Sequence, residues 1–325
     1  MKFKHLPRRS TCPGSYIAGV TSLFWVLIII LMKEGELFFD LPNRSLRSSA
    51  PGQVTNIGSS IHAPYLLPSR QGVVDQTVAI LIRCHSAYGK QLISLLWALD
   101  AQEGDHHIFV VVVPTEFDSI MVLKQILAVS WFNIHNKESK IHLMVQELDK
   151  HFYDEHCCLL KSICSEEWRL GKLARNWSTK ALDTYCTINS PMHYFITDMA
   201  FQLVKTECLA CTYFLVTNAD NSYSPNFLKV AINSLENTKS DICLANMIHR
   251  GQPINVKLES GSMDLGCVVS RLDIFRSLSL TFSSLLPENA EPQDWHDADF
   301  WMVYNLVNQY HRRVTYLREY LFVHN

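Results

Sequence analysis

The sequence predicts an α/β domain with a mixed, mostly parallel sheet flanked by helices, preceded by an N-terminal transmembrane helix. Two observations support this prediction. From residue 76 onward, short apolar runs alternate with stretches of helical periodicity, the order that builds a parallel sheet with helices on both faces. Near the N-terminus, Ser15–Met32 is an uncharged apolar run. A helix of that length spans roughly 27 Å, enough for a thin bilayer.

Composition limits the classes of protein that fit. The chain has 325 residues, of which 48% are hydrophobic and 18% charged, and such a chain is not disordered. Its 31 acidic and 29 basic residues give a net charge of -2. Because the chain as a whole offers no basic field, we expect no nucleic-acid partner. The 10 cysteines are too few for a disulfide scaffold.

The charges around the apolar run predict its orientation. Basic residues precede it and mostly acidic residues follow it, so the N-terminus is expected in the cytosol and the rest of the chain in the lumen. The expected parts are a cytosolic tail (1–14), a single-pass signal-anchor (15–32), a stem (33–75) and a catalytic domain (76–325). A thin-bilayer span favours the endoplasmic reticulum or Golgi membrane. A cleaved signal peptide and a buried core helix are the alternatives.

Two features of the part expected in the lumen say little about function. The stem carries Ser, Pro, Gly and Asn without sustained periodicity, which is typical of a spacer. Cys157-Cys158 and Cys208-x-x-Cys211 could suggest zinc, but no second pair with ligand spacing supports such a site. The sequence does not determine which cysteines pair.

The first half of the domain reads as alternating strands and helices. Thr77–Arg83 is an apolar, β-branched run, as expected for a strand buried on both faces. Lys90–Ala101 repeats leucines at helical spacing. His107–Pro114 is a second buried strand that ends at proline. Phe117–Val129 has helical periodicity, and Lys140–Leu148 resembles a third strand.

The second half continues with His193–Val204, a plausible helix, and with a buried strand over Thr212–Thr217. Asp241–Asn246 predicts a further strand. Asp294–Gln309 is acidic at its start and apolar later, which suits a helix with carboxylates in its first turn. Tyr316–His324 is expected as the last strand of the sheet.

Ligands in open α/β sheets bind outside the carboxyl ends of the strands, which directs attention to two segments. Arg83, His85 and Tyr88 lie at or after the end of the first strand, and Asn218 and Asp220 follow the central strand. A carboxylate at a strand end suits Mg²⁺ or Mn²⁺. A plain turn explains the same Asn and Asp residues, since both are turn formers.

The segment YFLVTNADNSYSPNFL resembles the metal-binding strand end of GT-A fold glycosyltransferases, which have a Rossmann-like sheet. That superfamily carries an Asp-x-Asp motif after a hydrophobic strand. The last Asp of the motif, which is usually the metal ligand, matches Asp220. The first is replaced by Asn218, which can form hydrogen bonds but adds no charge.

Three further segments resemble the same superfamily in the expected order. Gly261–Arg271, which contains Gly266, resembles the glycine-containing loop before a short strand that lines the donor pocket. Asp294–Phe300 resembles the x-Glu-Asp segment that opens a helix and carries the catalytic base. Its Asp matches Asp297, and His296 replaces the Glu. Leu321–His324 resembles the strand whose terminal His completes the metal site.

The resemblance implies a nucleotide-sugar donor and a hydroxyl acceptor on a glycan, protein or lipid. It implies Asp220 and His324 as ligands of Mn²⁺ or Mg²⁺, and Asp297 as the base of an inverting transfer. It also implies donor contacts from one group of residues: Arg83, His85, Tyr88, Asn218, Asp220 and Gly266.

Simpler roles stay open for several of these residues. Asp297 also suits a helix cap, and His324 also suits a surface histidine near the chain end. The replacements at Asn218 and His296 leave open a membrane-tethered module that binds sugar-nucleotide or glycan without turnover. No G-x-G-x-x-G follows a strand and no G-x-S-x-G is present, which disfavours a dinucleotide oxidoreductase and a serine hydrolase.

Overall fold

The computed structural model describes residues 76–84, 89–115, 129–130, 132–133, 139–146, 169, 172 and 190–324. The expected signal-anchor, the stem and nearly all of the helix expected over Phe117–Val129 lie outside these residues, as do His85 and Tyr88. None of the helices in the described ranges is both long enough and apolar enough to span a membrane.

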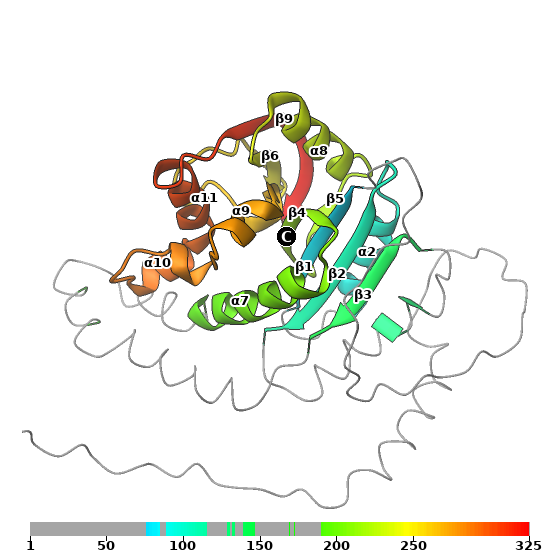
Figure 1. The fold of residues 1–325 in the computed structure, drawn as a ribbon, viewed down its shortest axis with the longest axis horizontal. Coiled ribbons are helices and arrows are strands. Elements are labelled where there is room, and N and C mark those ends of the chain that lie inside the picture. The colour runs from blue at the N-terminus through cyan, green and yellow to red at the C-terminus, as the bar shows by residue number, and fades with distance from the viewer. Residues whose placement is uncertain are drawn as a thin grey trace, which may run out of the picture. The chain divides into compact units, whose positions relative to one another are not determined.

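The described strands form one mixed sheet in the order β3-β2-β1-β4-β8-β6-β9-β5, with β7 paired to β6 (Figure 1). The strands are β1 (Thr77–Cys84), β2 (His107–Pro114), β3 (Ile141–Val145), β4 (Cys211–Asn218), β5 (Ser222–Tyr223), β6 (Ile242–His249), β7 (Gln252–Ile254), β8 (Val268–Arg271) and β9 (Val314–His324). A mixed α/β sheet with flanking helices fits the GT-A-like fold that the sequence resembles.

Strand direction decides where the site can form. β1 pairs in parallel with β2 and β4, β2 with β3, and β6 with β9. β8 runs antiparallel to both β4 and β6, so β4 and β6 point the same way. Six strands therefore end at the same edge of the sheet, and β8 begins there.

Helices alternate with the strands along the chain and pack against the faces of the sheet. They are α2 (Gly89–Asp100), α7 (Ser190–Glu207), α8 (Phe227–Thr238), α9 (Leu272–Ser277), α10 (Pro292–His296) and α11 (Ala298–Asn308), with short 3₁₀ turns η2 (Leu265–Cys267) and η3 (Ser283–Leu285). α7 packs on β1 and β2, whereas α8 packs on β6 and β9. In Figure 1, α7 lies in front of the sheet and α2 behind it.

The core explains the apolar runs of the sequence. Every residue of β1 is buried, which is why that strand has no polar face. Beside it, Phe201, Phe214, Phe275 and Phe282 join α7, β4, α9 and the start of η3 in one aromatic cluster, with ring centroids 4.5 to 6.1 Å apart. Such ring pairs add about 0.5–1.5 kcal/mol each beyond burial.

The structure differs from the sequence prediction at two points. The expected helix over Asp294–Gln309 is two helices, because the chain leaves helical geometry at Asp297, between α10 and α11. The sheet is mixed and mostly parallel, as expected, but it contains two short strands, β5 and β7, that the sequence did not predict. The short strands β5, β7 and β8 pair antiparallel, in ladders of only two or three residue pairs. Strands this short carry too few residues for an alternating pattern to be visible in the sequence.

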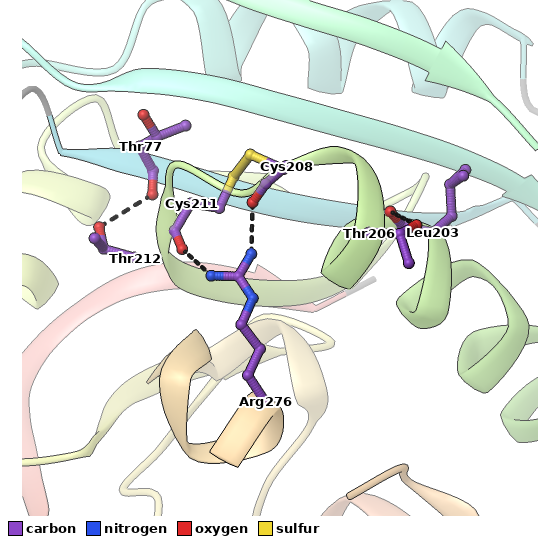
Figure 2. Close-up of a disulfide and its surroundings, with 7 residues drawn as sticks. All are labelled: Thr77, Leu203, Thr206, Cys208, Cys211, Thr212 and Arg276. Carbon is purple, nitrogen blue, oxygen red and sulfur yellow. Dashed lines mark hydrogen bonds between the residues drawn. A yellow bond between two sulfur atoms is a disulfide. The ribbon is translucent and has the colours of Figure 1, made fainter. Parts of the chain in front are cut away.

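One cysteine pair is resolved in the turn between α7 and β4. Cys208 and Cys211 form a disulfide, so neither is available as a zinc ligand. Figure 2 shows Arg276 of α9 reaching the same turn, where its guanidinium donates to the carbonyl of Cys211 at 2.9 Å and to that of Cys208 at 2.5 Å. The disulfide and the arginine together fix the start of β4.

Candidate functional site

The candidate site lies at the sheet edge where the parallel strands end. Arg83 is the second-to-last residue of β1, and Asn218, His249 and His324 are the last residues of β4, β6 and β9. Because β8 runs the other way, the turn before it brings Asp264 to the same edge. Residues far apart in the sequence therefore gather by strand direction alone.

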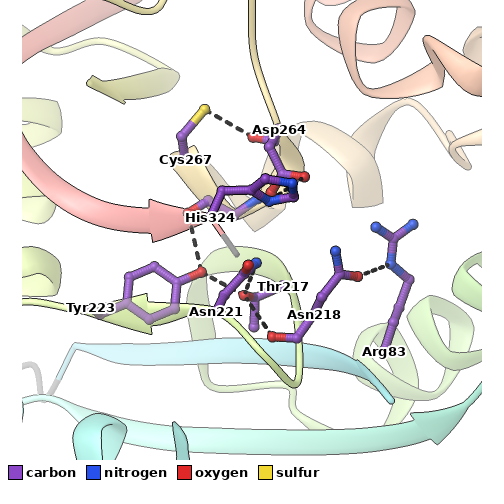
Figure 3. A network of polar contacts seen from close by, with 9 residues as sticks. Arg83, Thr217, Asn218, Asn221, Tyr223, Asp264, Cys267 and His324 are labelled. Atoms are coloured by element: carbon purple, nitrogen blue, oxygen red, sulfur yellow. Dashed lines mark hydrogen bonds and ion pairs between the residues drawn. The ribbon is translucent and has the colours of Figure 1, made fainter. Parts of the chain in front are cut away.

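Arg83 and Asn218 form the first pair of the site (Figure 3). The Nε of Arg83 donates to Oδ1 of Asn218 at 3.0 Å, and the guanidinium lies 5.4 Å from the ring centroid of Tyr194 on α7. Arg83 is only 9% exposed. Asn218 accepts this bond as a neutral amide, so unlike an aspartate it leaves the arginine charge uncompensated at that contact.

A buried polar network fixes the turn after β4. The Oγ1 of Thr217 lies 2.7 Å from the hydroxyl of Tyr223 and accepts from Nδ2 of Asn221 at 3.1 Å (Figure 3). The Tyr223 hydroxyl also lies 3.1 Å from the carbonyl of Gly266. Asp220, the expected metal ligand, is half-buried within this turn. The network therefore holds the turn that carries Asp220 against η2.

Gly266 is required by close packing. A Cβ at this position would lie 2.5 Å from Cζ of Phe322 and 2.9 Å from Oδ1 of Asp264. Its N–H donates to that same Oδ1 at 2.7 Å. The glycine therefore lets η2 approach β9 and turns the Asp264 carboxylate toward the strand ends.

The carboxylate of Asp264 lies beside two histidines. Its Oδ2 is 3.3 Å from Nδ1 of His324, within ion-pair range but without hydrogen-bond geometry. The ring of His324 lies 4.7 Å from that of His249, centroid to centroid. Burial, followed by the neighbouring His324, lowers the pKa of His249, so that ring stays neutral at physiological pH.

These residues fit a divalent cation that takes few protein ligands. The Nδ1 atoms of His249 and His324 are buried and have no hydrogen-bond partner among the described residues. An imidazole nitrogen beside a carboxylate oxygen is a suitable ligand pair for a divalent cation. Across the same residues, no group of three or more His, Cys, Asp or Glu side chains has the arrangement of a metal site. Mg²⁺ is usually held by only one or two protein carboxylates, with substrate phosphate oxygens supplying other ligands.

Asp297 is held by two neighbours. Ser260 donates from Oγ to Oδ2 of Asp297 at 2.6 Å, and Nδ1 of His296 lies 3.1 Å from Oδ1. Burial alone would raise the pKa of Asp297, but the bonds from His296 and Ser260 outweigh it and lower the pKa. The bond to Asp297 in turn raises the pKa of His296. Asp297 is therefore an ionised carboxylate at neutral pH.

Sequence reasoning gave no separate role to a second carboxylate, Asp299, two residues further on. Burial, together with the neighbouring Asp264, raises the pKa of Asp299 to about 7. Arg83 opposes this shift, which places the arginine within electrostatic reach. Burial also raises the pKa of Tyr194, whose hydroxyl stays neutral beside Asp299. The sequence does contain a signal that could have identified Asp299: the run Asp297-Ala298-Asp299 places a second carboxylate two residues after the predicted base.

Of the site residues expected from the sequence, His85 and Tyr88 lie outside the described residues, and Asp220 lies in the turn after β4. The structure brings Arg83 and Asn218 together, and it places Gly266 and His324 around Asp264. Asp297 lies where α11 begins. The partner that the structure gives His324 is Asp264, a residue to which sequence reasoning gave no role. Nothing in the spacing of these two residues, 60 positions apart, indicates the contact.

No protein-family model matches the sequence, and no curated protein matches it either. Among solved structures, the chain is similar to S. aureus TarS, at 17% identity and a TM-score of 0.46 over 76% of this chain and 36% of that one. It is similar to TarS 1-349 in complex with UDP-GlcNAc, at 16% identity and a TM-score of 0.44 over 77% and 58% of the two chains.

A further similar structure is the mannosyltransferase PcManGT from Pyrobaculum calidifontis in complex with GDP-Man and Mn²⁺, at 10% identity and a TM-score of 0.45. The match covers 76% of this chain and 56% of that one. This chain therefore spans less than two thirds of the length of each of these structures. Because the identities lie below 25% and the TM-scores below 0.5, the likeness by itself assigns no activity to this chain.

Proposed function

We propose that this chain is a glycosyltransferase that moves a sugar from a nucleotide-diphosphate donor to a hydroxyl acceptor on a glycan, protein or lipid, with inversion. The observation that supports this most is the buried guanidinium (Arg83) and the carboxylate–imidazole pair (Asp264 and His324) at one sheet edge. An ionised carboxylate, Asp297 at the start of α11, is bonded to Ser260 in the segment that leads to Asp264. Sugar transfer needs positive charge to stabilise the departing diphosphate and a base to take the proton of the acceptor hydroxyl.

The donor side of the site carries positive charge and neutral hydrogen-bond groups. When the donor leaves as a nucleoside diphosphate, negative charge develops on its phosphate oxygens, and the guanidinium of Arg83 favours that charge electrostatically. Asn218 holds Arg83 at Nε and fixes its orientation. A divalent cation bound at this edge by Asp220, His324 or Asp264 would neutralise the same diphosphate charge.

The acceptor side needs a base, because the pKa of a sugar or serine hydroxyl is far above 7. Asp297 takes this role as an ionised carboxylate held in place by Ser260 and His296. As the acceptor oxygen attacks the anomeric carbon, its proton passes to a carboxylate oxygen of Asp297. The bond between that carbon and the donor phosphate oxygen breaks on the opposite side, which is the geometry of inversion.

We further propose that residues 15–32 anchor the chain as a single-pass type II protein of the endoplasmic reticulum or Golgi membrane, with the described domain in the lumen. The basic residues before this run support that orientation. The Cys208–Cys211 disulfide supports an oxidising compartment, since disulfides persist there and are rare in the cytosol.

A binding module without turnover is the second candidate. It is favoured by one observation: both carboxylate oxygens of Asp297 already have partners, Ser260 and His296. In an active enzyme, the acceptor hydroxyl must reach a remaining lone pair of this carboxylate or displace one of the two partners. In a module they stay in place and serve only to fix the break between α10 and α11 and to hold Ser260 against it.

The test is nucleotide release from several nucleotide-sugar donors, with and without Mn²⁺, by the full-length chain. We expect Mn²⁺-dependent release by the wild type and its loss in Asp220→Ala. Asp105→Ala is the matched control, because Asp105 is an exposed carboxylate that precedes β2 at the opposite edge of the sheet. Donor binding without release in the wild type would favour the module. Equal release by Asp220→Ala and wild type would refute Asp220 as a metal ligand.

A further inference from the structure

A second candidate binding region lies away from the strand-end site. A cavity of about 470 Å³ opens between residues 255–258, which follow β7, and residues 316–318 of β9, with Asn246 of β6 between them. Its volume is within the range of about 300–1,000 Å³ that is typical of small-ligand pockets. None of its lining residues belongs to the site described above.

The cavity exists because β9 bulges away from β6. Ala245 pairs with Leu317 but the next residue, Asn246, pairs with Tyr320, so β9 carries extra residues opposite one position of β6. Asn246 bridges the bulge: its Nδ2 donates to the carbonyl of Arg318 at 2.9 Å, and its Oδ1 accepts from the backbone N–H of Val256 at 2.9 Å. Bulges that open a space in this way often re-aim side chains near a functional site.

A second amide completes this frame. Oδ1 of Asn255 accepts from Nδ2 of Asn246 at 3.2 Å and from the hydroxyl of Tyr320 at 2.8 Å. These bonds tie the residues after β7 to both sides of the bulge. The cavity is therefore held open by a hydrogen-bonded frame that does not depend on a ligand.

The side chains that line the cavity and could bind a ligand through charge or ring contacts are two cations and one aromatic ring. Within the described residues, the side chains of Lys257 and Arg318 have neither a hydrogen-bond nor an ion-pair partner. The nearest acids in sequence, Glu259 and Glu319, do not line the cavity. Tyr316 also lines it and is 50% exposed. Two unpaired cations beside an open aromatic ring suit a ligand with an apolar face and a negative charge.

The segment that lines the cavity continues along the chain into the strand-end site. Residues 255–258 lead into Ser260, which donates to Asp297, and on to Asp264, which lies against His324. Ser262 closes this segment on itself, because its Oγ lies 2.5 Å from the carbonyl oxygen of residue 257 and 2.8 Å from that of residue 259. A ligand in the cavity thus lies on the same short segment that positions the proposed base.

We propose that this cavity is an acceptor subsite that binds an anionic sugar residue of a glycan chain. The assignment as an acceptor subsite rests on the proposed transferase function. Lys257 and Arg318 bind the anionic group, which is a uronate carboxylate or a sulfate, and the ring of Tyr316 packs against the apolar face of the sugar. The segment 255–264 then presents the next part of the glycan to Asp297.

The test measures binding of three tetrasaccharides to the full-length chain by calorimetry: hyaluronan, which carries carboxylates only, a heparin fragment, which also carries sulfates, and neutral chitotetraose. We expect at least one anionic tetrasaccharide to bind at least tenfold more tightly than chitotetraose. Whether hyaluronan or heparin binds decides which anionic group is read. Binding should also weaken as salt rises, because charge pairing is screened.

Variants separate this cavity from general surface charge. The double variant Lys257→Gln, Arg318→Gln should bind the preferred tetrasaccharide at least tenfold more weakly, and Tyr316→Ala several-fold more weakly. Lys229→Gln is the matched control, because Lys229 is an exposed lysine of α8 that does not line the cavity. Melting temperatures of all variants confirm that they are folded.

Three outcomes overturn the proposal: equal binding of chitotetraose and the anionic probes, wild-type affinity in the double variant, or no binding of any probe. Nucleotide release by the wild type without an acceptor tests the transferase reaction separately. Failure of the reaction and failure of the subsite are therefore seen in different measurements.

Discussion

The contact between Gly266 and Phe322 allows a stability prediction that can be worked from distances. In Gly266→Ala, the new Cβ would lie 2.5 Å from Cζ and 2.7 Å from Cε2 of Phe322, whereas ordinary contacts begin at 3.4 Å. The ring must therefore move by roughly 1 Å, the kind of overpacking that costs about 1–3 kcal/mol. Phe322 is fully buried and stacked on Tyr223 at 5.2 Å, so it has little room to move.

Thermal unfolding of the full-length chain measures this cost. We expect Gly266→Ala to melt several degrees below wild type, at about 2–4 °C per kcal/mol for a domain of this size. Phe322→Leu is the matched partner: it loses ring volume by itself, but in the double variant it also removes the clash. The double variant should therefore lose at least about 1 kcal/mol less than the two single losses combined.

Two results would refute this reasoning. One is a melting temperature for Gly266→Ala that equals that of the wild type. The other is simple additivity in the double variant, which would mean that the two positions do not touch. A Gly266→Ala variant that is stable but has a raised KM for the donor would instead support the direct donor contact that the sequence resemblance implies.

Two further predictions concern titratable groups. Asp297→Asn should lower kcat about 10²-fold or more, whereas Asp299→Asn should cost less than tenfold; the reverse order in a rate assay across pH 5–9 would make Asp299 the base. Burial, followed by the charge of Lys140, lowers the pKa of His106 to about 4, so the folded state binds fewer protons than the unfolded state between pH 6.5 and 4. The contribution of His106 to stability is therefore complete above pH 6.5 and is lost as pH falls through that window. His106→Gln should flatten this part of the plot of melting temperature against pH, and parallel wild-type and variant curves would contradict the assignment.

Much of the fold could be predicted from local sequence, because a strand that is buried on both faces consists almost entirely of apolar residues. The strand expected over His107–Pro114 coincides with β2, and the one expected over Thr77–Arg83 ends one residue before β1 does. Such runs are apolar throughout, since neither face meets water. The amphipathic repeat of Lys90–Ala101 predicted α2 for the same reason, within one residue at each end.

The short elements could not be predicted in this way. β5, β7 and β8 are held by pairing with distant strands rather than by their own pattern. The break at Asp297 is another example. Its residues suit one continuous helix, but Ser260, 37 positions earlier, binds the Asp297 side chain where α10 ends. Contacts of this kind depend on which distant segments the fold brings next to each other.

The candidate site divides along the same line. The sequence by itself determined which polar residues follow buried strands, and so named Arg83, Asn218 and His324 as strand-end groups. Only the tertiary structure decided that His324 meets Asp264 and that Asp299 lies within reach of Arg83. The physical reason is that the burial of a strand determines which of its own residues are apolar, so the sequence shows it locally. The partner of a side chain depends instead on the order and direction of the strands, which cannot be read from a local pattern.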